Sequence, residues 1–161
     1  MTAAFLILSL AALAGSMTGL MFGKRLSRRE AYFADAVDFI NLFITEVKFR
    51  KNSTKQIVSE FLNARSTPLR LNLTEYLECG DYSSGLSLTR GLASASEAAE
   101  IKKLLLCLGT ADSETQIFEL ENFKERFAVY AAAAADKRKK FAAVYVKLGF
   151  FGGLALGIIL I

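Results

Sequence analysis

Side chains that commonly perform chemistry in proteins are scarce and scattered in this sequence. It contains no histidine, and its two cysteines, Cys79 and Cys107, do not form a Cys-x-x-Cys pair. Catalytic Ser-His-Asp or Cys-His arrangements and a Cys/His zinc site are therefore excluded. The carboxylates of Glu75, Glu78 and Asp81 have helical spacing, but with no histidine or nucleophile beside them they are typical of a solvated helix face. We predict no enzymatic activity, no metal and no cofactor.

A glycine-lysine segment near the N-terminus resembles a phosphate-binding loop only in part. In Gly19–Lys24 the glycines are too close together, and no serine or threonine follows the lysine where a nucleotide site needs one. The net charge of +4 and the pI of about 9.1 do not by themselves indicate nucleic acid, because the excess lies in basic clusters beside two apolar segments. We predict a membrane surface as the partner of these clusters and no nucleic acid.

The two apolar segments lie at the ends of the sequence. Residues 1–23 contain no charged side chain, and residues 141–161 contain one, Lys147. A helix of the second length rises about 31 Å, enough to cross the hydrocarbon of a bilayer. We predict a transmembrane helix in each segment, with the Lys147 stem carrying its ammonium back to the headgroups. Cleavage of the first segment after Ala14 is the alternative, although the segment lacks the positive start of a signal peptide.

The distribution of basic residues predicts how the protein sits in the membrane. Every lysine and arginine except Lys147 lies between the two apolar segments. The positive-inside bias then places residues 24–140 in the cytoplasm and both termini outside. The basic residues that adjoin the two segments, and that we assign to topology and the membrane surface, are Lys24, Arg25, Arg28, Arg29, Lys137, Arg138, Lys139 and Lys140.

Each apolar segment also has glycines on a four-residue period. This spacing lets transmembrane helices approach closely. The glycines pack either the two segments against each other or copies of the protein against one another, and possible homo-oligomers follow from the second reading. The candidate packing residues are Gly15, Gly19, Gly23, Gly149, Gly153 and Gly157.

A further basic cluster, Lys48, Arg50 and Lys51, lies away from both segments. In an unbroken helix from Lys24, Lys51 would stand about 40 Å from the headgroups, several Debye lengths away, so lipid attraction does not explain it. Cations are favourable at a helix C-terminus, which is the ordinary explanation. The alternative is that these residues dock an acidic cytoplasmic partner.

Residues 24–140 have the pattern of a small helical domain. We expect a first helix over about residues 27–50, either separate from or continuous with the preceding apolar segment, and a last helix from Ser113 that runs unbroken to the C-terminus. Capping boxes are expected at Ser53, Ser94 and Ser113, a helix start at Pro68 and a terminator at Gly109. A strand over residues 83–90 is not excluded by the pattern. The expected apolar stripes are Phe33, Val37, Ile40, Ile44 and Val47 in the first helix, Ile57, Val58, Phe61 and Leu62 in the second, Leu73, Tyr76 and Leu77 in the third, Ile101, Leu104, Leu105 and Leu108 in the fourth, and Ile117, Leu120, Phe123, Phe127, Tyr130 and Ala134 in the last.

The first and last helices must run antiparallel, since one leaves the membrane and the other returns to it. The predicted fold is therefore all-α, a compact antiparallel helical bundle flanked by an N-terminal and a C-terminal transmembrane helix, the latter continuous with the last bundle helix.

Essentially the whole sequence resembles the stage III sporulation protein AB family, and its final third carries the most specific part of the resemblance. The resemblance rests on Leu108-Gly109, Asp112, Gln116 and Leu148-Gly149 followed by Gly152 or Gly153, and on the two-span layout. That family is similar to the cytoplasmic domain of type II secretion and type IV pilus inner-membrane platform proteins. The resemblance implies a platform of the channel complex between mother cell and forespore, in the forespore outer membrane on the mother-cell side. It implies a secretion-type ATPase, stage III sporulation protein AA, and other membrane components as partners.

Two other functions stay open at this point. A small pore-forming or membrane-remodelling protein would use the paired glycine patterns, although neither apolar segment has a polar stripe to line a channel. A secreted helical domain with a cleaved leader and a C-terminal anchor would use the first segment as a signal.

Overall fold

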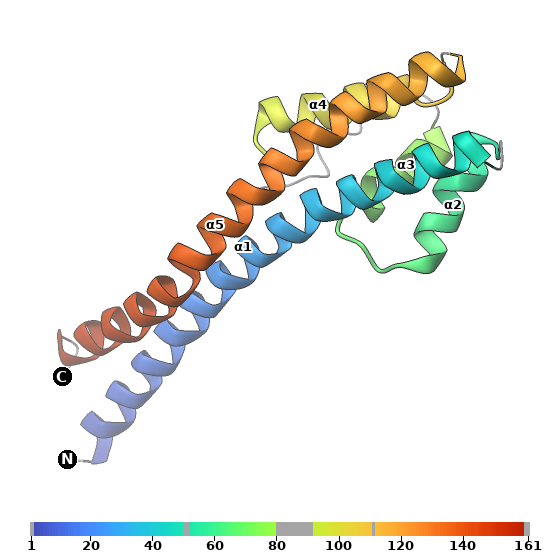
Figure 1. Cartoon of the computed structure of the whole chain (residues 1–161). Coiled ribbons are helices and arrows are strands. Elements are labelled where there is room, and N and C mark those ends of the chain that lie inside the picture. The colour runs from blue at the N-terminus through green and yellow to red at the C-terminus, as the bar shows by residue number, and fades with distance from the viewer. Residues whose placement is uncertain (1, 50–51, 80–91, 111, 160–161) are drawn as a thin grey trace. The chain divides into compact units, whose positions relative to one another are not determined.

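The computed structural model describes residues 2–49, 52–79, 92–110 and 112–159, without the side chains of residues 2–8 and 79 (Figure 1). These ranges form five α-helices and contain no strand, so the all-α prediction is confirmed for the part of the chain described. The possible strand over 83–90 lies outside it. The helices are α1 (Thr2–Phe49), α2 (Thr54–Ala64), α3 (Arg70–Cys79), α4 (Ala95–Cys107) and α5 (Ser113–Ile159).

The chain divides into two compact units. Unit 1 consists of Met1–Glu30 and Ala133–Ile161, and unit 2 consists of Ala31–Ala132. The two long helices, α1 with 48 residues and α5 with 47, each contribute to both units. Both are uninterrupted, because neither contains a proline and the glycines of each lie in its apolar part. The sequence predicts this for α5 and leaves it open for α1.

Two of the three predicted capping boxes are confirmed. At the start of α2 the backbone N–H of Gln56 donates to Ser53 Oγ, and the Gln56 side chain accepts from the Ser53 N–H at 3.1 Å. At the start of α4, Ser94 and Glu97 make the same reciprocal pair, with 2.7 Å between Ser94 N and Glu97 Oε2. These caps satisfy N–H groups that have no partner within a helix.

The third predicted box, Ser113 with Gln116, is wrong. Asp112 caps α5 instead: its carboxylate accepts from the Thr115 N–H at 3.2 Å, and its backbone oxygen accepts from the Gln116 N–H at 2.9 Å. Hydrogen bonds from the Thr115 side chain and backbone hold the pKa of Asp112 below its ordinary value. The Gln116 side chain turns to the Cys107 carbonyl, 3.5 Å away. The Asp112 carboxylate therefore caps α5 in place of the Ser113 hydroxyl that the sequence pattern predicted.

The other two boundary predictions differ in outcome. Gly109 terminates α4 with a φ of +76°, a conformation in which a side chain is strained, so the predicted terminator is confirmed. Pro68 lies in the turn before α3 rather than within the helix, and α3 begins at Arg70. Thr67 leads this turn, because its hydroxyl accepts from the Leu69 N–H at 3.0 Å.

The core of unit 2 lies on two faces of α1. One face is the predicted stripe, in which Phe33 stacks on Phe127 and contacts Tyr130 of α5, with ring centroids 6.4 and 5.5 Å apart. The second face was not predicted and packs toward α2 and α3, where Phe39 meets Phe61 at 5.3 Å. Its buried residues are Tyr32, Ala36, Phe39 and Phe43. The predicted buried residues of α2, and Ile101, Leu104, Leu105 and Leu108, are all buried.

Polar contacts hold α1 to α3 and to the segment that joins α2 to α3. The Thr67 hydroxyl donates to Asp35 Oδ2 at 2.6 Å, and Arg65 forms an ion pair with Asp38. The buried Tyr32 hydroxyl donates to Asn72 Oδ1 at 3.2 Å. Burial, and then the nearby charge of Glu97, raise the pKa of Tyr32, which keeps this donor protonated.

Candidate functional site

The predicted packing glycines bring α1 and α5 together in unit 1. A Cβ added at Gly15 would overlap the Gly149 carbonyl oxygen and lie 2.9 Å from the Gly153 Cα. A Cβ at Gly19 would lie 2.5 Å from the Tyr145 carbonyl oxygen. Rising numbers in α1 thus meet falling numbers in α5, so the two helices are antiparallel here. Their backbones are too close for any side chain at these positions.

The approach is tightest in the middle of the apolar part and relaxes toward the basic residues. A Cβ at Gly23 would meet its nearest atom, the Ala142 carbonyl oxygen, only at 4.0 Å, whereas one at Gly153 would overlap the Ala11 carbonyl oxygen. Gly157 is buried, and Gly152, which is off the four-residue period, has nothing within 4 Å. The closest backbone contacts are therefore made by Gly15, Gly19, Gly149 and Gly153, all of which lie on the four-residue period.

An aromatic group links the two helices where the apolar part ends. Phe22 of α1 stacks on Tyr145 of α5 with ring centroids 5.7 Å apart, and Phe141 lies 6.3 Å from the same ring. Tyrosine side chains such as that of Tyr145 favour the level of the headgroups in a membrane. These residues were not predicted from the sequence, although their position beside the basic clusters is a signal for them.

An ion pair joins the two helices among the basic residues. Arg138 Nε lies 2.7 Å from the carboxylate of Glu30, which is largely buried. Sequence reasoning missed Glu30, a single acid directly after a basic run. The other topology residues lie on the same two helices, where Lys24, Arg25, Arg28, Lys137, Lys139 and Lys140 are exposed or half-buried and Arg29 is half-buried.

The structure describes one member of the proposed docking cluster. Lys48 Nζ lies 3.8 Å from Glu121 on α5, and both side chains are about half exposed. An exposed pair at this distance contributes little stability. Arg50 and Lys51 lie outside the described residues, so the cluster as a whole remains a prediction.

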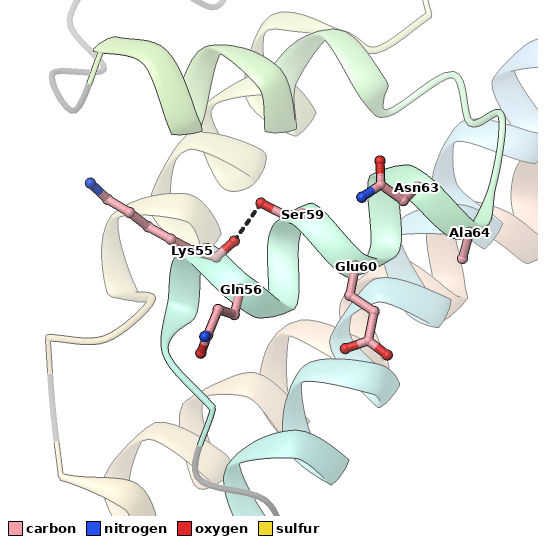
Figure 2. Close-up of a pocket in the computed structure, with 6 residues that line it drawn as sticks. All are labelled: Lys55, Gln56, Ser59, Glu60, Asn63 and Ala64. Atoms are coloured by element: carbon pink, nitrogen blue, oxygen red, sulfur yellow. Dashed lines mark hydrogen bonds between the residues drawn. The ribbon is translucent and has the colours of Figure 1, made fainter.

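The exposed side of α2 forms an open hollow of about 640 Å³. Its six lining residues come from this one helix, and Figure 2 shows Lys55 and Glu60 pointing in different directions, with the Ser59 hydroxyl donating to the Lys55 carbonyl at 2.8 Å. These side chains do not converge on a common point. The hollow therefore has no arrangement that could perform acid-base or nucleophilic chemistry. The lining residues are Lys55, Gln56, Ser59, Glu60, Asn63 and Ala64.

A smaller hollow lies between α4 and α5 beside Cys107. Burial, and then the charge of Glu119, raise the pKa of the Cys107 thiol to about 11. The thiol is therefore protonated near neutral pH, whereas a reactive cysteine needs a thiolate. Arg126 at the same hollow lies 4.6 Å above the Phe123 ring and 3.7 Å from Glu100. Among the described residues no three His, Cys, Asp or Glu side chains are grouped to hold a metal.

One helix in the described part of the chain, α5, is long and apolar enough to cross a membrane by length and composition. This suggests that the protein associates with a membrane. The apolar part of α1 begins within residues 2–8, whose side chains are not described, so the N-terminal span over 1–23 stays a prediction. The sidedness of the bundle is likewise untested.

A family model for stage III sporulation protein AB matches residues 4–161, nearly the whole chain. No curated protein and no solved structure matches the chain.

Proposed function

The chain belongs to the stage III sporulation protein AB family, and we propose that it is a non-enzymatic, membrane-anchored platform within a secretion or channel complex of the developing spore. In this proposal the complex joins mother cell and forespore, and the protein lies in the outer forespore membrane. Unit 2 faces the mother-cell cytoplasm, where it docks a secretion-type ATPase such as stage III sporulation protein AA. Both termini lie on the far side.

The glycine contacts of unit 1 support this proposal most directly. Gly15, Gly19, Gly149 and Gly153 pack one helix of the chain against the other, and each helix continues without a break into unit 2. Two anchoring helices that are packed together in this way resist moving apart. A platform needs this property, since it must hold a bound partner at a fixed place on the membrane.

The charges of unit 1 support the membrane assignment. Eight lysines and arginines adjoin the apolar parts of α1 and α5, in the two clusters given above. The cytoplasmic leaflet is anionic and attracts cations next to a span, each by about 1 kcal/mol. The ion pair between Arg138 and Glu30 uses one of these cations to join the two helices.

The pore-forming alternative has less support. It requires the glycine faces to lie between copies of the protein, and four of these glycines contact the other helix of the same chain. A glycine already in backbone contact within one chain has no room for a second helix.

Capture of the ATPase by the full-length protein tests the platform. We expect the detergent-solubilised chain to retain stage III sporulation protein AA on an affinity resin, and the triple variant Lys48→Glu, Arg50→Glu, Lys51→Glu to lose most of it. Charge reversal replaces attraction to an acidic partner by repulsion, and the change in the weak Lys48–Glu121 pair has little effect on folding.

A matched variant controls for net charge. Lys102→Glu, Lys103→Glu, Lys124→Glu makes the same change on α4 and α5 and should leave capture intact. An equal loss of ATPase capture in both triple variants would show a non-specific charge effect. Full capture by the Lys48, Arg50, Lys51 variant would show that this cluster does not dock the ATPase. If neither the wild type nor the variants retain the ATPase, this partner is wrong.

A further inference from the structure

Lys147 is the one charged residue in the apolar part of α5, residues 141–159. Its side chain is exposed, and no described residue pairs with its ammonium. A cation within a membrane is costly unless it reaches the headgroups or meets an opposite charge. Lys147 therefore needs the headgroups or an opposite charge that the described residues do not supply.

Lys147 lies on the side of α5 that faces away from α1. The residues of α5 in backbone contact with α1 are Tyr145, Val146, Gly149 and Gly153. At about 100° per residue, Lys147 lies about 100° to 160° around the helix from all four. The Lys147 side chain consequently faces lipid or another molecule, and not α1.

Helix geometry directs the Lys147 side chain toward the basic end of α5. The Cα–Cβ bonds of a helix tilt toward its N-terminus, so the stem of Lys147 leans back toward Lys140. Lys140 precedes it by seven residues, nearly two full turns, and therefore lies on the same outer face at a distance of about 10 Å along the axis. Lys140 is also exposed.

The aromatic group defines the depth of this pair. Tyr145, which stacks on Phe22 and lies near Phe141, marks the expected headgroup level. Lys147 lies about 3 Å further along the axis than Tyr145. A lysine stem spans this depth easily. The Lys147 ammonium therefore reaches the phosphates from the hydrocarbon side, and Lys140 reaches them from the aqueous side.

We propose that Lys140 and Lys147 form a binding site for the phosphate of an anionic phospholipid on the outer face of α5. This proposal rests on the membrane anchoring argued above and adds a specific ligand class to it. An acidic side chain in the membrane helix of another protein is the rival occupant. The shallow depth of Lys147 favours the lipid, because a phosphate is already present at that level.

Lipid binding to the full-length protein tests the site. The wild type in mild detergent would be titrated with short-chain phosphatidylglycerol or phosphatidylcholine, and bound lipids counted by native mass spectrometry. We expect phosphatidylglycerol to bind the wild type, and Lys147→Leu and Lys140→Leu to raise the half-saturating concentration about fivefold each. Lys147→Arg should bind as the wild type does.

Lys139→Leu is the matched control. It removes the same charge one residue from Lys140 but about 100° around the helix, so its lipid binding should change little. Equal binding by wild type and Lys147→Leu would overturn the lipid site in favour of an acidic membrane helix as the occupant. An equal loss in Lys139→Leu would reduce the effect to net charge and would also overturn it.

Carbonate extraction of cell membranes separates this proposal from the platform proposal. If wild type and Lys147→Leu both stay in the membrane pellet while their lipid binding is identical, the lipid site alone fails. If the wild type is released into the supernatant, the membrane anchoring itself fails.

Discussion

A glycine between α1 and α5 matters because of the atom it lacks. A Cβ at Gly153 would overlap the Ala11 carbonyl oxygen and lie 3.1 Å from the Ala12 Cα, and both of these are backbone atoms that cannot turn aside. A Cβ at Gly152 would meet nothing within 4 Å. Two adjacent glycines in one helix therefore have opposite tolerance for the same substitution.

Gly153→Ala should push the two helices of unit 1 apart, whereas Gly152→Ala should not. Overpacking of this kind typically costs about 1–3 kcal/mol, and Gly152→Ala gains a little helix propensity. Spin labels at the exposed positions Leu13 and Phe151, in a chain without native cysteines, would report the change. We expect a broader and longer distance distribution for Gly153→Ala only.

An unchanged distribution for Gly153→Ala would contradict the tight pairing, and equal broadening in both variants would assign the effect to helix propensity. The four-residue period includes the four glycines in close contact, Gly15, Gly19, Gly149 and Gly153, and also Gly23, whose added Cβ would meet nothing closer than 4.0 Å. It could not decide between pairing within a chain and pairing between copies, because both need the same missing side chains.

Helix α1 shows what an apolar stripe does and does not reveal about an element. The predicted stripe through Phe33 contacts α5, and the neighbouring stripe through Phe39 packs against α2. The second stripe has the same spacing of three and four in the sequence, with the acids Asp35 and Asp38 beside it. These acids bind Thr67 and Arg65 of the segment before α3. Tertiary partners for charged residues are distant in sequence, so a local pattern does not reveal them.

Phe39→Ala should destabilise unit 2 strongly because the side chain is fully buried on this second face. Phenylalanine-to-alanine changes in cores cost about 3–5 kcal/mol. Phe49→Ala, at the exposed end of the same helix with 80% of the residue accessible, should change stability by less than about 0.5 kcal/mol. Denaturant unfolding of the full-length protein in detergent, followed by circular dichroism, would measure both.

Similar losses for the two variants would show that α1 does not bury its second face. The caps of α2 and α4, by contrast, were predicted correctly because a capping box is local: both partners lie within four residues. The start of α5 shows the limit of that rule, since Asp112 and Ser113 are both good capping residues and only the backbone geometry selects the first.

At the scale of the whole molecule, the charge distribution carries the prediction of sidedness. All basic residues except Lys147 lie between the apolar ends, so translocation of residues 24–140 would carry 19 of the 20 lysines and arginines across the membrane. The family match does not specify the side of the membrane on which unit 2 lies, and the contacts between α1 and α5 are the same in either orientation. The prediction follows from sequence-level electrostatics alone.

Labelling of single cysteines tests the orientation directly. In a chain whose Cys79 and Cys107 are replaced by serine, expressed in vegetative cells so that it inserts into the plasma membrane, Asn63→Cys on the exposed side of α2 should react with a membrane-impermeant maleimide only after spheroplasts of these cells are permeabilised. Thr2→Cys should react in intact spheroplasts, because both termini are predicted to lie outside, and it confirms that the reagent was active. Labelling of Asn63→Cys in intact spheroplasts would place unit 2 outside the cytoplasm. A cytoplasmic ATPase could then not reach it, so the platform proposal would fail together with the predicted topology.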